Sequence, residues 1–131
     1  MPGSSLWLLP PQSHPLTPLL TQLIRQTSSH FNSPHLFIPH ITLTSEIDPR
    51  TYEPSPQEWL DSLPLLNSRE VVVRLGQLCS EDVFFRKLYS LVQKNDAITE
   101  LGRLARENVQ KEEGDKADWA KNTYMPHLSL L

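Results

Sequence analysis

The spacing of hydrophobic residues near the N-terminus changes from that of a strand to that of a helix. Residues 5–9 are mostly apolar and are closed by Pro10 and Pro11, which is typical of a short strand. Thr17 and Pro18 then supply an N-cap and a first helical residue. Apolar residues follow on one face of a helix, at Leu16, Leu19, Leu20, Leu23 and Ile24. The chain is therefore predicted to begin with a strand and an amphipathic helix.

The remaining pattern predicts further strands that alternate with helices and loops. In order, we expect a strand over 37–44, a loop over 45–55, a short helix capped by Ser55, a strand over 70–75 that forms a hairpin with 83–92, a helix from Asn95 to about Gln110, and a charged surface loop over 111–122. Hairpins without regular strand-helix alternation favour an α+β domain with an antiparallel sheet.

Composition is that of one globular domain over residues 1–131, with 38% hydrophobic and 21% charged residues. The net charge of −3 leaves no surplus of Lys and Arg. Long nucleic acids attract proteins through such a surplus, so none is expected as a partner. A small phosphate ligand needs only a few local donors and stays compatible with this charge.

Cysteine content and apolar run length bear on the compartment. The single cysteine, Cys79, has no internal disulfide partner, which fits a reducing environment. No apolar run reaches the length of a membrane span, and the first residues lack the basic region of a signal peptide. We expect an intracellular, cytoplasmic protein without a membrane span, and leave association with endomembranes open.

Two segments of the chain are nearly the same. "FIPHITL" over 37–43 aligns without gaps to "YMPHLSL" over 124–130, and each position keeps its character: aromatic, apolar, Pro, His, apolar, hydroxyl, apolar. A lone histidine in an apolar strand is more often a structural residue than a catalytic one. A matched pair, each with a hydroxyl two residues later, instead favours an active site.

Strand geometry relates this spacing to chemistry. Because side chains alternate, His40 and Thr42 share one face of their strand, and His127 and Ser129 share one face of theirs. Two imidazoles can act as base and acid near neutral pH. Two hydroxyls can donate to phosphate oxygens as charge develops. Hydrolysis of a strained cyclic phosphodiester needs little more, and no metal.

The paired motifs resemble the signature of the two-histidine (2H) phosphoesterase superfamily. Within it, "SSLWLLPP", "PHITLT" and "YMPHLSLL" are similar to the fungal and plant-type 2′,3′-cyclic-nucleotide 3′-phosphodiesterases. The resemblance implies a bilobed, pseudo-two-fold α+β fold, with antiparallel sheets lining a central cleft and helices outside. It covers essentially the whole chain. Family members continue beyond the second motif, so we expect this chain, which stops at Leu131, to hold an incomplete second lobe.

The resemblance also implies a function. It makes His40 and His127 the catalytic pair and Thr42 and Ser129 the phosphate-binding hydroxyls of a metal-independent, cofactor-free hydrolase, expected to be monomeric. Its implied substrates are nucleoside 2′,3′-cyclic phosphates and ADP-ribose 1″,2″-cyclic phosphate, a by-product of tRNA splicing. We favour His127 as base and His40 as acid, although the near-symmetry of the motifs leaves the reverse open.

Other interpretations of single residues stay open. Tyr124 is a candidate for contact with the substrate, since its ring can stack on a base and its hydroxyl is polar, although strand packing is the commoner use. His30, His35 and His40 recur every five residues, but zinc sites usually use tighter spacing with Cys or carboxylate partners, so no metal is expected. The alternative function is a non-catalytic nucleotide- or RNA-end-binding module on the same fold.

Overall fold

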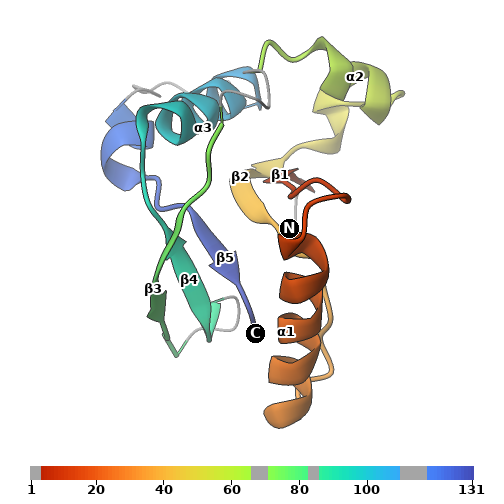
Figure 1. Ribbon diagram of the computed structural model, residues 1–131. Helices are drawn as coiled ribbons and strands as arrows, with labels where there is room; N and C mark the ends of the chain where they lie inside the picture. Colours follow the sequence, from red (N-terminus) through yellow and green to blue (C-terminus); the bar gives the residue numbers. More distant parts are fainter. Residues whose placement is uncertain (1–3, 66–70, 83–85, 110–117) are drawn as a thin grey trace. The chain divides into compact units, whose positions relative to one another are not determined.

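The computed structural model describes residues 4–65, 71–82, 86–109 and 118–131 (Figure 1). The elements in chain order are β1 (Ser4–Leu8), α1 (Leu16–His30), β2 (Ile41–Ile47), η1 (Pro49–Thr51), α2 (Pro56–Ser62), β3 (Leu75–Cys79), β4 (Tyr89–Val92), α3 (Asp96–Val109), η4 (Trp119–Thr123) and β5 (His127–Ser129). The strands form one sheet in the order β1-β2-β5-β4-β3, and β2–β5, β5–β4 and β4–β3 pair antiparallel. The predicted α+β class with an antiparallel sheet is confirmed.

The chain divides into two compact units. The first comprises residues 1–7, 42–73 and 94–125, and the second comprises residues 8–41, 74–93 and 126–131. Strands β1 and β2 each cross from one unit to the other within a few residues. Both histidines of the repeated motif belong to the second unit.

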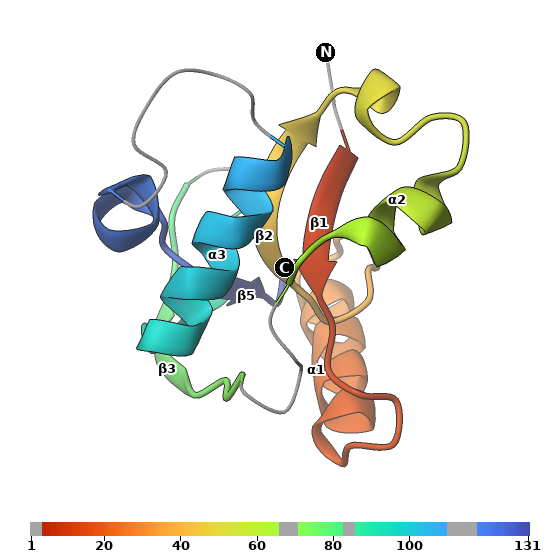
Figure 2. The same cartoon turned by 90° about the horizontal axis from the view of Figure 1, so that it is seen from above.

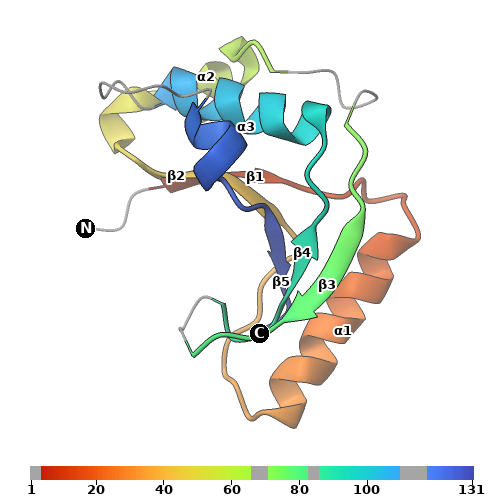
Figure 3. The same cartoon turned by 90° about the vertical axis from the view of Figure 1, so that its left-hand side faces the viewer.

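The second unit is built from α1 and the strands β3, β4 and β5, which lie side by side in Figure 3. Its core joins the helix to the sheet through six buried side chains: Leu20, Ile24, Ile41, Val92, Leu128 and Leu130. Ile41 and Leu128 come from the two copies of the motif. Ile41 of the first copy and Leu128 and Leu130 of the second therefore pack against α1, and burial of these apolar side chains joins the helix to the strands.

The buried face of α1 is narrower than the apolar pattern predicted. Leu20 and Ile24 are 8% and 1% exposed. Leu16, Leu19 and Leu23 have the same helical spacing but are 40%, 60% and 41% exposed. Periodicity identified the helix correctly, but it did not decide which part of the apolar face meets the sheet.

The start of α1 also differs from the prediction. The helix begins at Leu16, with Pro15 in the N-cap position. The hydroxyl of Thr17, the predicted cap, instead donates to the carbonyl of Pro11 at 2.7 Å. The bond ties the segment before the helix to its first turn, and the predicted capping role of Thr17 is wrong.

Strand β2 is shifted along the chain relative to the predicted strand over 37–44. It begins at Ile41 and continues to Ile47, into the predicted loop over 45–55. Pro39 lacks a backbone N–H, and proline is confined to the ends and edges of strands. His40 consequently lies just before the regular strand, at the position where the chain enters the sheet.

The predicted strand over 70–75 is wrong in position. Residues 71–74 are not in a strand, and β3 runs from Leu75 to Cys79. Val72 is 54% exposed, so its β-propensity is not matched by burial. Pairing with β4 decides the strand, and it begins where Leu75 meets Val92. The predicted hairpin is present as β3 and β4, but its second strand, expected over 83–92, begins only at Tyr89, and residues 86–88 are not in a strand. Residues 66–70 and 83–85 lie outside the described residues.

In the first unit, α3 follows the prediction closely. The side chain of Asn95 accepts a hydrogen bond from the backbone N–H of Ile98 at 2.9 Å, as an N-cap does. Ile98, Leu101 and Ala105, which share one face of the helix, are at most 3% exposed. The short helix α2 begins at Pro56, as expected from the proline at its first position.

The charged segment over 111–122 was predicted to be a loop, and part of it is helical. Residues Trp119–Thr123 form the π-helical turn η4, which lies beside α3 in Figure 2. The guanidinium carbon of Arg106, on α3, lies 4.5 Å from the centre of the Trp119 ring. This cation–π contact, together with ring stacking on Tyr124, holds the turn against α3. Residues 110–117 lie outside the described residues.

Candidate active site

The two copies of the motif pair with each other as β2 and β5. Ile41 is the register partner of Leu128. Extended by one residue beyond this pair, an antiparallel register predicts that His40 lies opposite Ser129 and that His127 lies on the diagonal from His40. Diagonal Cβ atoms in such ladders are about 7 Å apart. The register thus predicts that the two imidazoles lie on one side of the second unit.

The imidazole of His40 is oriented by the chain just before it. Its Nδ1 lies 2.7 Å from the carbonyl oxygen of Ile38. Because a carbonyl can only accept, Nδ1 must hold the proton of this bond, and Nε2 is the nitrogen that gains or loses a proton. The ring of Phe37 meets the imidazole edge-on, with centroids 6.0 Å apart. The sequence did not signal the role of the Ile38 carbonyl, since a backbone atom has no residue type.

The surroundings of His40 favour its neutral form. Burial lowers the pKa of His40, the bond to the carbonyl of Ile38 opposes this shift, and the charge on His127 lowers the pKa further. The effect of His127 is the smallest of the three causes, and it is the one that links the two imidazoles.

His127 is held by its neighbours in the sheet. It is the register partner of Leu91, and the ring of Tyr89 lies on the adjacent strand with its centroid 5.3 Å from that of the imidazole. Tyr89 itself is 4% exposed and is the register partner of Ser129. No local signal in the sequence marks Tyr89, because only the β4–β5 pairing brings it beside the motif.

The two predicted hydroxyls lie in different units. Ser129 ends β5 in the second unit, where it is the register partner of Tyr89, and is half-buried. Thr42 follows Ile41 in β2, belongs to the first unit and is also half-buried. Both occupy the strand positions that the motif predicted, two residues beyond a histidine, and their contact with a substrate stays a prediction.

Tyr124, the third predicted binding residue, is integrated into the first unit. Its side chain is 8% exposed, and its hydroxyl donates to the backbone carbonyl of Thr42 at 2.9 Å. Burial raises the pKa of the Tyr124 hydroxyl, which therefore stays protonated and remains a donor. The structure thus gives this hydroxyl a partner within the protein itself.

An NMR titration tests the environment of His40. We expect the pKa of His40 to lie below its ordinary value of 6.5. As pH is lowered, His40 is then protonated at a higher pH in the unfolded chain than in the folded one. The free energy of unfolding therefore falls as pH is lowered through the range just below 6.5. Replacing His127 by Gln removes a repelling charge and should raise the pKa of His40. A pKa at or above 6.5 in the unmodified protein would contradict the described burial.

Two further observations concern metals and membranes. Within residues 4–65, 71–82, 86–109 and 118–131, no group of three or more His, Cys, Asp or Glu side chains is arranged to hold a metal ion. Over the same ranges, every helix is too short or too polar to cross a membrane.

Comparison with known proteins defines the family. The model of the cyclic phosphodiesterase-like protein family matches residues 1–131. A protein of Phaeosphaeria nodorum named 2′,3′-cyclic-nucleotide 3′-phosphodiesterase is 54% identical over 133 residues, covering all of this chain and 69% of that protein. Proteins of the same name from Neurospora crassa and Yarrowia lipolytica are 40% and 27% identical, with 71% and 72% of their lengths covered. The chain belongs to the cyclic phosphodiesterase-like family, as the paired motifs indicated.

Proposed function

We propose that this protein hydrolyses nucleoside 2′,3′-cyclic phosphates to nucleoside 2′-phosphates without a metal. The observation that supports this most directly is the pairing of Ile41 with Leu128, the residues that follow the two histidines, because the same antiparallel register predicts His40 and His127 diagonally across the ladder. The electrostatic effect of His127 on His40 supports it as well. The family match and the names of the relatives support the same substrate class.

The proposed reaction is a single displacement at phosphorus. One imidazole takes a proton from water, whose oxygen forms a bond to phosphorus, while the bond from phosphorus to the ribose 3′ oxygen breaks. The other imidazole gives a proton to that oxygen, so atoms and charge balance. The hydroxyls of Thr42 and Ser129 donate to the non-bridging oxygens, which gain charge in the transition state. Both histidines come from one chain, so a monomer suffices.

We propose His127 as the base and His40 as the acid. A lowered pKa makes the protonated imidazole of His40 a stronger proton donor toward the departing ribose oxygen. The bond from Nδ1 to the carbonyl of Ile38 leaves the working proton on Nε2. His127 then accepts the proton of the attacking water.

The same chemistry extends to a second substrate. We propose that ADP-ribose 1″,2″-cyclic phosphate is opened to ADP-ribose 1″-phosphate, because it contains the same strained five-membered ring on a ribose. The proposal rests on the resemblance of the motifs. It also rests on the small size of the cyclic phosphate, which is the only part of the substrate that must lie between the two imidazoles. A substrate that has the same cyclic phosphate ring but a different attached group tests whether the ring itself is what the protein recognises.

Product analysis tests the proposed function. Incubation with 2′,3′-cyclic AMP in the presence of EDTA should give 2′-AMP, whereas 3′,5′-cyclic AMP, which has a less strained ring, should stay intact. ADP-ribose 1″,2″-cyclic phosphate should be opened under the same conditions. Formation of 3′-AMP, or loss of turnover on chelation, would contradict the mechanism. Tight binding of 2′,3′-cyclic AMP without turnover would favour the alternative, a non-catalytic nucleotide-binding module.

A further inference from the structure

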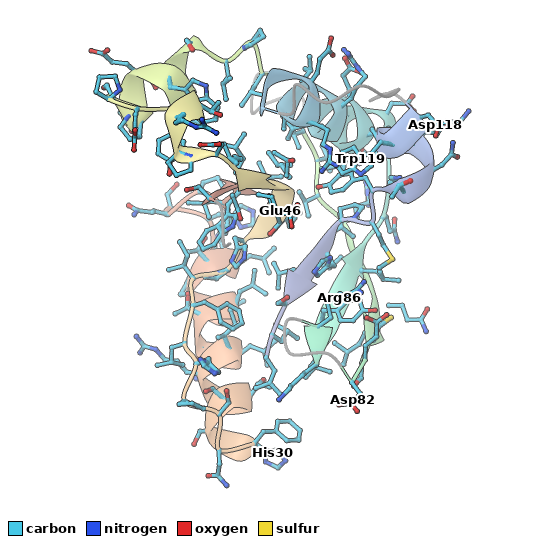
Figure 4. All side chains as sticks on the ribbon, turned by 180° about the vertical axis from the view of Figure 1, so that it is seen from behind. His30, Glu46, Asp82, Arg86, Asp118 and Trp119 are labelled. Atoms are coloured by element: carbon cyan, nitrogen blue, oxygen red, sulfur yellow. The ribbon has the colours of Figure 1, made fainter. Side chains whose placement is uncertain are left out.

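The aromatic ring of Tyr124 is fixed on several sides within the first unit. It stacks on the indole of Trp119, with centroids 5.1 Å apart and an angle of 22° between the planes. The ammonium group of Lys94 lies 5.8 Å from the ring centre, and the same group donates to the carbonyl of Lys121 at 2.9 Å. Figure 4 shows Trp119 where η4 meets α3. A ring held in this way has little freedom to move its hydroxyl.

The backbone of α3 also approaches this ring closely. A methyl group added at Gly102 would lie 2.7 Å from Cε2 and 2.8 Å from Cδ2 of Tyr124. Contacts this short do not occur between carbon atoms in well-packed interiors, so any side chain at Gly102 would displace the ring. The glycine therefore allows the approach that sets the position of the Tyr124 hydroxyl.

The hydroxyl acts on the backbone of β2. It donates to the carbonyl of Thr42 at 2.9 Å, across 82 residues of chain. The residue of β2 that pairs with β5 is Ile41, one residue before Thr42. The bond is part-buried, and a side chain is the donor to this backbone carbonyl. The position of Thr42 in the strand is thereby tied to η4 and α3.

We propose that Tyr124 is a positioning residue: it fixes the backbone of Thr42 so that the threonine hydroxyl is held ready for the phosphate. This inference rests on the proposed function for the role of Thr42, and it replaces direct contact of Tyr124 with substrate. Gly102 and Trp119 contribute to the same effect, because both contact the Tyr124 ring and so fix the position of its hydroxyl. The proposal predicts that changes at Tyr124 act only through Thr42.

A double-mutant cycle tests this coupling. Tyr124→Phe should lower kcat/KM about tenfold, since it removes one buried hydrogen bond. In a Thr42→Val background, Tyr124→Phe should have almost no further effect, because the hydroxyl that it positions is gone. An equal loss in both backgrounds, or no loss in either, would overturn the proposal. Tyr52→Phe is the matched control: it also removes a hydroxyl bonded within the first unit, to Ser4 at 2.7 Å, and should leave kcat/KM unchanged.

Amide hydrogen exchange supplies a measurement that needs no activity. Tyr124→Phe and Gly102→Ala should both increase the exchange rate at residues 42–44 of β2 at least tenfold, whereas Tyr52→Phe should not. Unchanged rates in both variants would overturn the positioning role. The failure of the proposed function itself has a different signature, namely full turnover after His40→Ala and His127→Ala.

Discussion

Replacing either His40 or His127 by alanine is expected to lower kcat/KM for 2′,3′-cyclic AMP about a thousandfold. In the proposed mechanism each imidazole moves one proton in the transition state, and such a group typically contributes a factor of about 10² to 10⁴. The two losses should be far from additive, because the base and the acid act in the same step. The measurement is steady-state hydrolysis, with the rate of the double variant compared with those of the single variants.

His30→Ala is the control for these variants. His30 ends α1 in the same unit and is exposed, so its replacement removes an imidazole without touching β2 or β5. Its kcat/KM should match that of the unmodified protein. Full activity in His40→Ala or His127→Ala would end the two-histidine mechanism. Circular dichroism spectra like that of the unmodified protein would exclude unfolding as the cause of a loss.

The leaving group separates the two roles. From an aryl phosphodiester, p-nitrophenolate leaves without being protonated. Loss of the acid therefore changes the rate of hydrolysis little, whereas loss of the base still lowers it. We therefore expect His40→Ala to retain most of its turnover of this ester and His127→Ala to lose it. The reverse result would exchange the two assignments and leave the pair itself intact.

The largest expected effect on stability is that of Ile24→Ala in α1. Ile24 is 1% exposed and belongs to the core cluster that contains Ile41 and Leu128. Truncating a fully buried isoleucine leaves a cavity and costs about 2 to 5 kcal/mol of unfolding free energy. Because the cluster joins α1 to the strands of both motifs, this loss should also reduce the hydrolysis rate at temperatures where unfolding begins. Urea unfolding followed by circular dichroism measures the change.

Leu19→Ala is the matched control within the same helix. Leu19 lies on the apolar face that periodicity predicts, yet it is 60% exposed. Its truncation should change the free energy of unfolding by no more than about 0.5 kcal/mol. Equal destabilisation by Ile24→Ala and Leu19→Ala would contradict the described orientation of α1. The pair thus compares the expectation from sequence with the packing in the structure.

Local sequence signals located some elements well and others poorly. The helix over Asp96–Val109 followed its cap and its apolar spacing, because Asn95 and the buried side chains act within a few residues of each other. The strand expected over 70–75 lies instead at Leu75–Cys79, because a strand exists only where a partner pairs with it. The β-propensity of a segment does not specify which other strand will pair with it.

Some features around the candidate site have no signal in the sequence. The carbonyl of Ile38 that orients His40 is a backbone atom, and Tyr89 reaches His127 only through the pairing of β4 with β5. The bond from Tyr124 to Thr42 joins residues 82 positions apart. Each depends on a long-range arrangement that no local pattern specifies.

The sequence by itself determined the family and the α+β class, and it predicted His40 and His127 as the catalytic pair, because the motif occurs twice with the same residue types. Only the tertiary structure decided which face of α1 is buried, where β2 and β3 begin, and how the tautomer of His40 is set. The reason is physical. Residue types and their spacing are local, whereas burial, strand register and hydrogen-bond partners depend on segments that meet only after the chain has folded.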